Sequence, residues 1–167
     1  WVDLQHKASK AHWHLQGAQG VISDGGRGVV GAAIAVRSTI GMTNAAGSPF
    51  DFSPSGSEGR VAVAWIDGVL SGGLVLVSLY LWVSEGLTTR NMQILHAAGE
   101  AIARFKGPWV TAGDFNMTPS ELEQADGWLS RVGGRIFAPE LQTCRSALGG
   151  RVIDFFVVDQ RIAGAVK

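Results

Sequence analysis

The stretch Trp109-Val-Thr-Ala-Gly-Asp-Phe-Asn-Met-Thr-Pro-Ser-Glu121 decides the fold of this 167-residue chain. Its first residues are apolar and predict a short strand, and the glycine that follows permits a tight turn. Thr118 then suits the N-cap of a helix, Pro119 its first position, and Glu121 the third position of a capping box. The stretch therefore predicts a strand, a turn and a helix in succession, and the turn carries an acid and an amide.

Two helices are predicted on either side of this strand and turn. Apolar residues recur every three or four positions between Thr88 and Lys106, which predicts a helix that Gly107-Pro108 ends. The second helix is expected to run from Thr118 to Gly133-Gly134. The expected inner faces are Met92, Leu95, Ala98, Ile102 and Phe105 in the first helix, and Leu122, Ala125, Leu129 and Val132 in the second.

Most of the other apolar segments predict strands. The runs Arg60–Asp67 and Leu74–Tyr80 are joined by a Gly/Ser turn, which favours an antiparallel hairpin. Because both runs are apolar on both faces, the hairpin is expected in a sheet that is covered on both sides. The pattern predicts one mixed α/β domain without internal repeats. Further strands are expected at 29–37, within 135–143 and at 151–158, with a loop at 38–59.

The composition excludes several classes of protein. Lys and Arg (14) balance Asp and Glu (14), and 46% of the residues are hydrophobic, which excludes a polybasic arm and a disordered acidic tail. The zero net charge weakens tight DNA binding but leaves it open, since arginines can cluster in space. No apolar run reaches the roughly 18–20 residues of a membrane helix, so no membrane partner is expected. The single cysteine, Cys144, excludes a disulfide framework and is expected to be a small buried residue.

The turn Gly113-Asp-Phe-Asn116 is the first candidate site. Asp114 and Asn116 are two residues apart, so their side chains face the same way in extended backbone. The acid can accept a proton from water and the amide can donate to a phosphate oxygen, which suits hydrolysis of a phosphodiester. The alternative is a plain strand-to-helix turn, where Asp and Asn are common.

Two strands carry further candidates. Asp154 lies in the apolar run Ile153–Val158 and is expected to be partly buried, where a carboxylate needs a partner. It could orient a catalytic His, or it could be a structural Asp bonded to backbone N–H groups or an Arg. Tyr80 is the only tyrosine, and at the end of its strand it could either reach a phosphate or simply pack.

Taken together and in order, these motifs resemble a known family over roughly residues 25–160. The chain is similar to endonuclease/exonuclease/phosphatase domains, the fold class of DNase I, abasic-site endonucleases and the nicking domains of non-LTR retrotransposons, and most resembles the retroelement type. The motifs that carry the resemblance are the early strand Gly31-Ala-Ala-Ile-Ala-Val36, the run ending in Tyr80, Arg90 at the start of a helix, Gly113-Asp-Phe-Asn116 and Ile153-Asp-Phe155.

The resemblance implies a four-layer α/β sandwich and metal-dependent cleavage of DNA or RNA with Mg²⁺ or Mn²⁺. By matching position, Asp114 would orient or deprotonate the attacking water, and Asp154 would pair with a catalytic His. Asn116 would hold the phosphate, and Tyr80 would hydrogen-bond to one of its oxygens. The other phosphate-binding residues expected are Arg90 and Thr143.

The sequence also departs from the family pattern. The family's metal-binding Glu follows Leu-Gln near the N-terminus, but here Leu4-Gln5 is followed by His6, a poorer ligand for a hard cation. If that alignment does not hold, the ligand would lie upstream of this chain. The family's later Ser-Asp-His segment has no counterpart, since the last histidine is His96.

We therefore expect residues 1–167 to form a single incomplete domain, truncated at both ends and inactive or impaired as a nuclease. The first alternative is a non-catalytic remnant or binding module with the same fold. The second is a phosphatase that acts on a small phosphoester or a phosphoinositide.

Three other motifs suggest weaker alternatives. Gly26-Arg-Gly-Val-Val-Gly31, with Asp51 downstream, fits a dinucleotide-binding fingerprint, but a strand follows where that fingerprint needs a helix. His12-Trp-His14 could belong to a zinc or nickel site, although a solvent-facing pair is the simpler prediction. Trp82 could stack on a nucleic-acid base.

Overall fold

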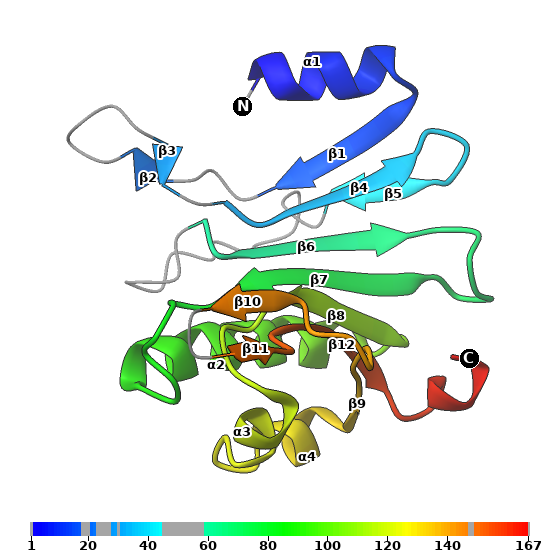
Figure 1. Ribbon diagram of the computed structural model, residues 1–167. Coiled ribbons are helices and arrows are strands. Elements are labelled where there is room, and N and C mark those ends of the chain that lie inside the picture. The colour runs from blue at the N-terminus through cyan, green and yellow to red at the C-terminus, as the bar shows by residue number, and fades with distance from the viewer. Residues whose placement is uncertain are drawn as a thin grey trace.

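A computed structural model describes residues 2–17, 21–22, 28–29, 31–44, 59–146 and 149–166. Figure 1 shows four layers: a helix over a two-stranded sheet, then a six-stranded sheet, then a second layer of helices. This is the α/β sandwich predicted from the sequence. The upper layers are α1 (Val2–Lys10) and the pair β1 (Trp13–Gly17) and β4 (Ala33–Arg37), and the lower helices are α2 (Thr89–Phe105), α3 (Pro119–Glu123) and α4 (Trp128–Val132).

The six-stranded sheet has the strand order β5-β6-β7-β8-β12-β9. The β6–β7 hairpin is antiparallel as predicted, β8 runs parallel to β7, and β12 runs antiparallel to β8. Its strands are β5 (Met42–Asn44), β6 (Val61–Ile66), β7 (Leu74–Tyr80), β8 (Trp109–Asp114), β9 (Gly134–Phe137) and β12 (Asp154–Asp159). The remaining elements are β2 (Val21–Ile22) paired with β3 (Gly28–Val29), β10 (Cys144–Ser146) paired with β11 (Gly149–Arg151), and the 3₁₀ turn η2 (Ala163–Ala165).

An apolar core lies on each face of the six-stranded sheet. The larger core joins the sheet to the lower helices, and the smaller one joins it to β4. This confirms that the β6–β7 hairpin is covered on both sides. The larger core includes Leu79, Leu95, Ile102, Trp109 and Phe115, and the smaller one includes Ile34, Val36, Ala64 and Ile66.

Several predicted elements need correction. The single helix predicted after Thr118 is broken into α3 and α4, because Asp126 and Gly127 take left-handed backbone angles (φ 41° and 65°). β5 lies inside the segment predicted as a loop. α1 was missed because it is almost wholly exposed and so has no buried apolar stripe to predict it. Asp51 and most of the Gly26–Gly31 motif lie outside the described residues.

The best-predicted helix is α2. Leu95, Ala98 and Ile102 of its expected inner face are buried, and Met92 and Phe105 pack against the same core. Thr88 is the N-cap of α2. Among the helices that the structure describes, none combines the length and the apolar character that crossing a membrane requires.

Candidate active site

A row of side chains crosses four neighbouring strands. Tyr80 on β7 is paired in register with Asp114 on β8, which is paired with Asp154 on β12. Arg60, the residue just before β6, extends the row on the other side of β7. The backbone N–H of Tyr80 donates to the carbonyl of Arg60 (2.9 Å), so these two residues are paired. Neighbours in such a row share one face of the sheet, with Cβ atoms about 4.5–5.5 Å apart. The sheet thus brings three predicted site residues together.

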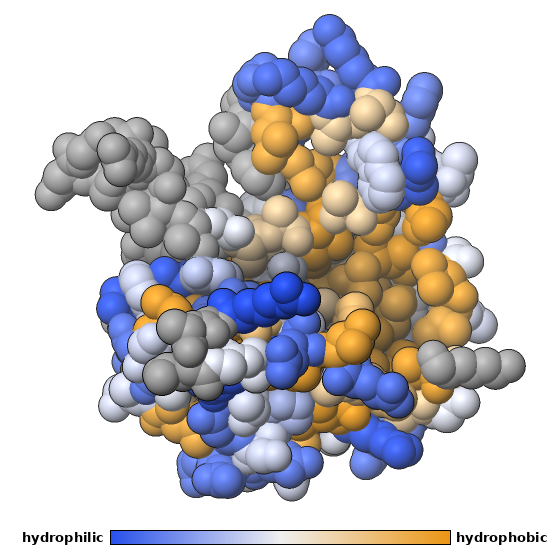
Figure 2. Space-filling model, in the orientation of Figure 1, coloured by the Kyte–Doolittle hydropathy of each residue, from blue (hydrophilic) through white to orange (hydrophobic). Residues whose placement is uncertain are grey.

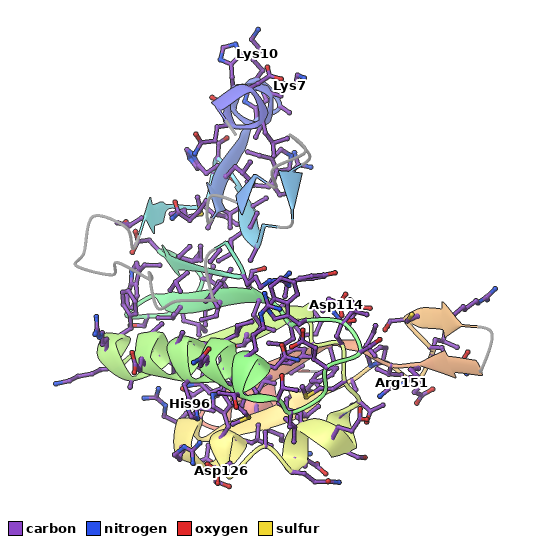
Figure 3. All side chains as sticks on the ribbon, turned by 90° about the vertical axis from the view of Figure 1, so that its left-hand side faces the viewer. Lys7, Lys10, His96, Asp114, Asp126 and Arg151 are labelled. Carbon is purple, nitrogen blue, oxygen red and sulfur yellow. The ribbon has the colours of Figure 1, made fainter. Side chains whose placement is uncertain are left out.

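The row lies on the face of the sheet away from the lower helices. Leu79 and Phe155, which alternate with Tyr80 and Asp154 along their strands, are buried in the core beneath α2. Figure 3 shows Asp114 apart from His96 and Asp126, which lie in the helix layer. The site is therefore built on strand ends and does not involve the helix-layer hollow of about 480 Å³ beside His96.

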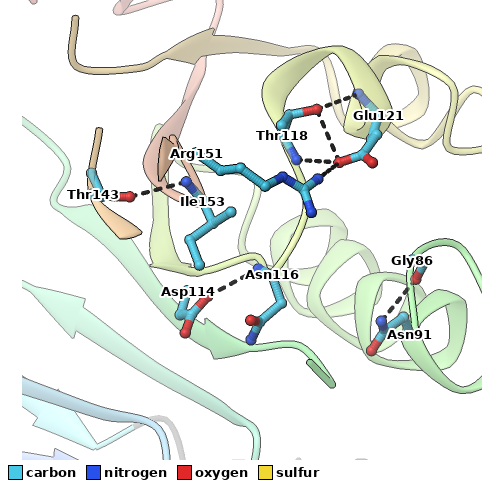
Figure 4. A network of polar contacts seen from close by, with 9 residues as sticks. All are labelled: Gly86, Asn91, Asp114, Asn116, Thr118, Glu121, Thr143, Arg151 and Ile153. Carbon is cyan, nitrogen blue, oxygen red and sulfur yellow. Dashed lines mark hydrogen bonds and ion pairs between the residues drawn. The ribbon is translucent and has the colours of Figure 1, made fainter. Parts of the chain in front are cut away.

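The turn after β8 is held by local hydrogen bonds and by one buried ring. The backbone N–H of Asn116 donates to Asp114 Oδ1 (2.9 Å, Figure 4). The side-chain Nδ2 of Asn116 donates to the carbonyl of Leu81 (2.9 Å). Asn116 has a φ of 49°, a conformation that Asn tolerates better than most residues. Phe115 is fully buried and stacks on Phe155 with ring centroids 4.1 Å apart. The acid and the amide are thereby fixed next to each other.

The surroundings of Asp114 favour its protonated form. Burial raises the pKa of this carboxyl, and the neighbouring charge of Asp154 raises it further, while the backbone N–H of Asn116 acts in the opposite direction. A higher pKa makes a carboxylate a stronger proton acceptor. The shift of Asp114 is therefore in the direction that favours proton transfer to it.

The helix after the turn begins as predicted. Thr118 Oγ1 accepts from the backbone N–H of Glu121, whose carboxylate in turn accepts from the backbone N–H of Thr118 (2.6 Å). Arg151 reaches across from β11 and donates to the same carboxylate at 2.5 Å (Figure 4). The Thr118 N–H is the main cause that lowers the pKa of Glu121, and Arg151 adds to it. The capping box therefore also ties the β10–β11 ribbon to the site.

Asp154 is exposed, so the prediction that it is partly buried is wrong. Side chains alternate along β12, and Asp154 lies on the face opposite to the buried Phe155 and Val157. Phe156, on the same face as Asp154, is 52% exposed, which shows that no described residue closes over this part of β12. Apolarity of the strand did not imply burial of this face.

Thr143 supports Asp154 through the backbone. Its Oγ1 accepts from the backbone N–H groups of Ile153 and Asp154, both at 3.0 Å. The predicted phosphate-binding hydroxyl is thus next to the row, and its own hydrogen is left to donate. Cys144, the next residue, was expected to be buried, but it is only partly buried.

No histidine in the described part of the chain is hydrogen-bonded to Asp154. His6, His12 and His14 are exposed in the N-terminal segment, and His96 Nε2 lies 3.3 Å from an Arg131 guanidinium nitrogen in the helix layer. His12 also precedes β1, with a φ of 61°, so it does not share a strand face with His14.

The described residues do not fit a metal site of the expected kind. Within the described ranges, no three His, Cys, Asp or Glu side chains lie close enough to hold an ion. Leu4-Gln5-His6 is an exposed part of α1 and not a strand end. A second Leu-Gln pair, Leu15-Gln16, lies in β1 beside β4, and Gly17, which ends the strand, has no side-chain ligand atom.

Trp82 cannot act as a platform for a base, so this prediction is wrong. The guanidinium carbons of Arg60 and Arg90 lie 3.3 and 3.4 Å from its ring centroid. Two groups at such short distances cannot share one face of a ring, so each covers an opposite face. Arg90 is in addition paired with Glu85 at 3.4 Å.

Two hollows adjoin the row. The first has a volume of about 690 Å³ and is lined by Asp114, Asp154 and apolar residues that include Phe156. The second has a volume of about 380 Å³, and the residues that line it include Asn116 and Arg151. Figure 2 shows apolar side chains gathered between the layer of β1 and β4 and the layers below it. The acid and the amide thus each border open space that a ligand can enter.

Sequence and structure comparisons agree with this description. The profile of the Endonuclease/Exonuclease/phosphatase family matches residues 1–165. No curated protein matches the sequence at a significant level.

Solved structures share the fold. The endonuclease domain of TRAS1, a telomere-specific non-LTR retrotransposon, is 18% identical with a TM-score of 0.60, over 95% of this chain and 77% of that domain. ANGEL2, a 2',3'-cyclic phosphatase, is 13% identical with a TM-score of 0.62, over 95% and 65% of the two chains. The human Nocturnin catalytic domain with bound sulfate is 12% identical with a TM-score of 0.58, over 93% and 64%. The predicted DNase I-like fold class is confirmed, and the chain belongs to the Endonuclease/Exonuclease/phosphatase family.

Proposed function

We propose that the row on β7, β8 and β12 is a phosphodiester site for nucleic acid, of the hydrolytic type, and that hydrolysis is impaired in this chain. The observation that carries the proposal is the register of Tyr80, Asp114 and Asp154, with Asn116 fixed beside Asp114. Groups that accept a proton and donate to a phosphate oxygen are then side by side, as in-line attack of water on phosphorus requires.

Each residue has a role that its contacts permit. Asp114 accepts the proton of the attacking water, helped by its raised pKa. Asn116 keeps one amide hydrogen free after its bond to the Leu81 carbonyl, and donates it to a phosphate oxygen. Tyr80 donates its hydroxyl to the same phosphate. Arg90 and Thr143 extend the phosphate-binding surface on either side of the row.

We expect hydrolysis to be impaired because two parts of the family's site have no counterpart among the described residues. Asp154 has no described histidine to orient, and neither Leu4-Gln5 nor Leu15-Gln16 is followed by the Glu of the family pattern. Mg²⁺ or Mn²⁺ dependence therefore stays a prediction, as does a single incomplete domain over residues 1–167. The TRAS1 domain is an endonuclease and ANGEL2 a 2',3'-cyclic phosphatase, so nucleic-acid phosphates are the substrates tested first.

We expect the 167-residue chain to leave supercoiled plasmid intact in Mg²⁺ or Mn²⁺, at the background level of Asp114→Ala. The reason is that the described residues give Asp154 no histidine partner and bring no three metal-binding side chains together. Agarose-gel conversion of supercoiled to open-circle DNA measures this. Robust nicking that Asp114→Ala abolishes would show a complete site and contradict the impairment. Phosphate release from a small phosphoester, with DNA left intact, would instead favour the phosphatase alternative.

A further inference from the structure

Arg60 is a buried cation that forms no ion pair with any acid in the described part of the chain. It is only 4% exposed, and its hydrogen bond within the described part of the chain runs from Nη1 to the Tyr80 carbonyl (3.2 Å). In the described ranges, no carboxylate lies within ion-pair distance of it. Buried charges in proteins are normally paired, because an unpaired buried charge is costly. The guanidinium thus retains N–H donors that call for an acceptor.

Trp82 supplies a second unsatisfied donor at the same place. Its Nε1 is buried and has no hydrogen-bond partner among the described residues. The great majority of buried polar side-chain atoms are bonded. Since the ring of Trp82 is in contact with the Arg60 guanidinium, the two unsatisfied donors belong to one cluster.

The cluster has an excess of positive charge. Arg60 and Arg90 cover the two faces of Trp82, and the only carboxylate that pairs with either of them in the described ranges is Glu85, on Arg90. Burial lowers the pKa of Arg60 and the charge of Arg90 acts in the same direction, while Tyr80 and Glu85 act in the opposite one. An anion bound here would relieve both unfavourable effects.

We propose that Arg60, Trp82 and Arg90 form a second phosphate-binding site next to the Asp114 site. The proposal rests on the proposed function, because the second phosphate would belong to the same substrate. Arg60 and Asp114 are separated by β7, and two strand spacings amount to roughly 10 Å between their backbones. The phosphate at Arg60 is therefore proposed to be the one that flanks the cleaved phosphate on the β6 side, with the Tyr80 ring, 4.9 Å from the Arg60 guanidinium carbon, between the two. Trp82 is a positioning residue that holds both guanidiniums flat.

The test replaces Arg60 by an apolar residue of similar length. Inorganic phosphate is titrated calorimetrically into the full chain at constant ionic strength, without metal, and thermal unfolding is followed alongside. We expect Arg60→Met to weaken phosphate binding by roughly thirtyfold or more, as loss of a buried charged partner does. We also expect Arg60→Met to unfold at the same or a higher temperature in phosphate-free buffer, because an unpaired buried charge has been removed.

The matched control is Lys10→Ala, which removes one exposed positive charge at the end of α1, far from Asp114 in Figure 3, and is expected to change neither quantity. A purely structural Arg60 would instead lower the unfolding temperature of Arg60→Met without phosphate, and that result overturns the proposal. Unchanged phosphate affinity, or no binding by the wild-type chain, overturns it as well.

A parallel titration with a short single-stranded oligonucleotide distinguishes the source of the phosphate. Weaker binding of both ligands by Arg60→Met supports a substrate phosphate of nucleic acid. Weaker binding of inorganic phosphate alone overturns the link to the nucleic-acid site. If the wild-type chain binds the oligonucleotide at Tyr80 and Asp114, and Arg60→Met changes the affinity for neither ligand, the inference about Arg60 fails and the proposed function stands.

Discussion

Gly113→Ala is expected to destabilise the folded chain by about 3 kcal/mol or more, at the upper end of what overpacking costs. A Cβ atom on Gly113 would lie 1.9 Å from the carbonyl oxygen of Leu79 and 2.8 Å from its carbonyl carbon. These are backbone atoms of the paired strand β7, so no side-chain rotation can make room. The strands would have to separate where Tyr80 meets Asp114, and the site would be lost with them.

Urea unfolding followed by far-UV circular dichroism measures this loss. Gly164→Ala is the matched control, since a Cβ there meets nothing within 4 Å, and we expect it to leave the free energy of unfolding almost unchanged. If Gly113→Ala were as stable as Gly164→Ala, the close pairing of β7 and β8 at this point would be wrong.

Phe115→Ala is expected to cost about 3–5 kcal/mol, the usual range for removal of a buried Phe side chain. Phe115 is fully buried between Asp114 and Asn116, and its ring lies parallel to that of Phe155 at 4.1 Å, with 8° between the planes. The ring anchors the turn to the core beneath α2. Its loss removes packing energy and also frees the two polar residues that it holds in place.

The control for Phe115→Ala comes from the neighbouring strand. Phe156 is 52% exposed, so Phe156→Ala is expected to cost less than about 1 kcal/mol. Phe115→Leu keeps most of the side-chain volume. It should lower the free energy of unfolding by about 1 kcal/mol through loss of the contact between the two rings, and by a further amount where the leucine packs less well. Equal stability of Phe115→Ala and Phe156→Ala in chemical denaturation would refute the anchoring role of Phe115.

The parts of the fold that local chemistry decides could be predicted from the sequence. The capping box of Thr118 and Glu121 depends on residues three apart, and it is present. The β6–β7 hairpin and the apolar stripe of α2 depend on short-range periodicity, and both are confirmed. The turn that carries Asp114 and Asn116 could be found in the same way.

The rest depends on contacts between distant segments. The break between α3 and α4 lets the indole N–H of Trp128 donate to the Leu95 carbonyl (2.6 Å) on α2, a contact that periodicity alone does not reveal. The exposure of Asp154 depends on which other segments cover β12, and the sequence of β12 itself does not contain that information. Arg60 was missed, although counting back through the predicted hairpin from Tyr80 would have placed it in the row.

The central claim is that the row of Tyr80 and Asp114, with Asn116, is where a nucleic-acid phosphate binds. The most direct test is to titrate the isotope-labelled chain with a short single-stranded oligonucleotide and to follow the backbone amide signals by NMR. We predict that the largest shifts fall on residues 80–82 and 113–118, with small or no shifts in α1 and around His96. Shifts confined to α1 or to the helix layer, or no shifts at all, would contradict the claim.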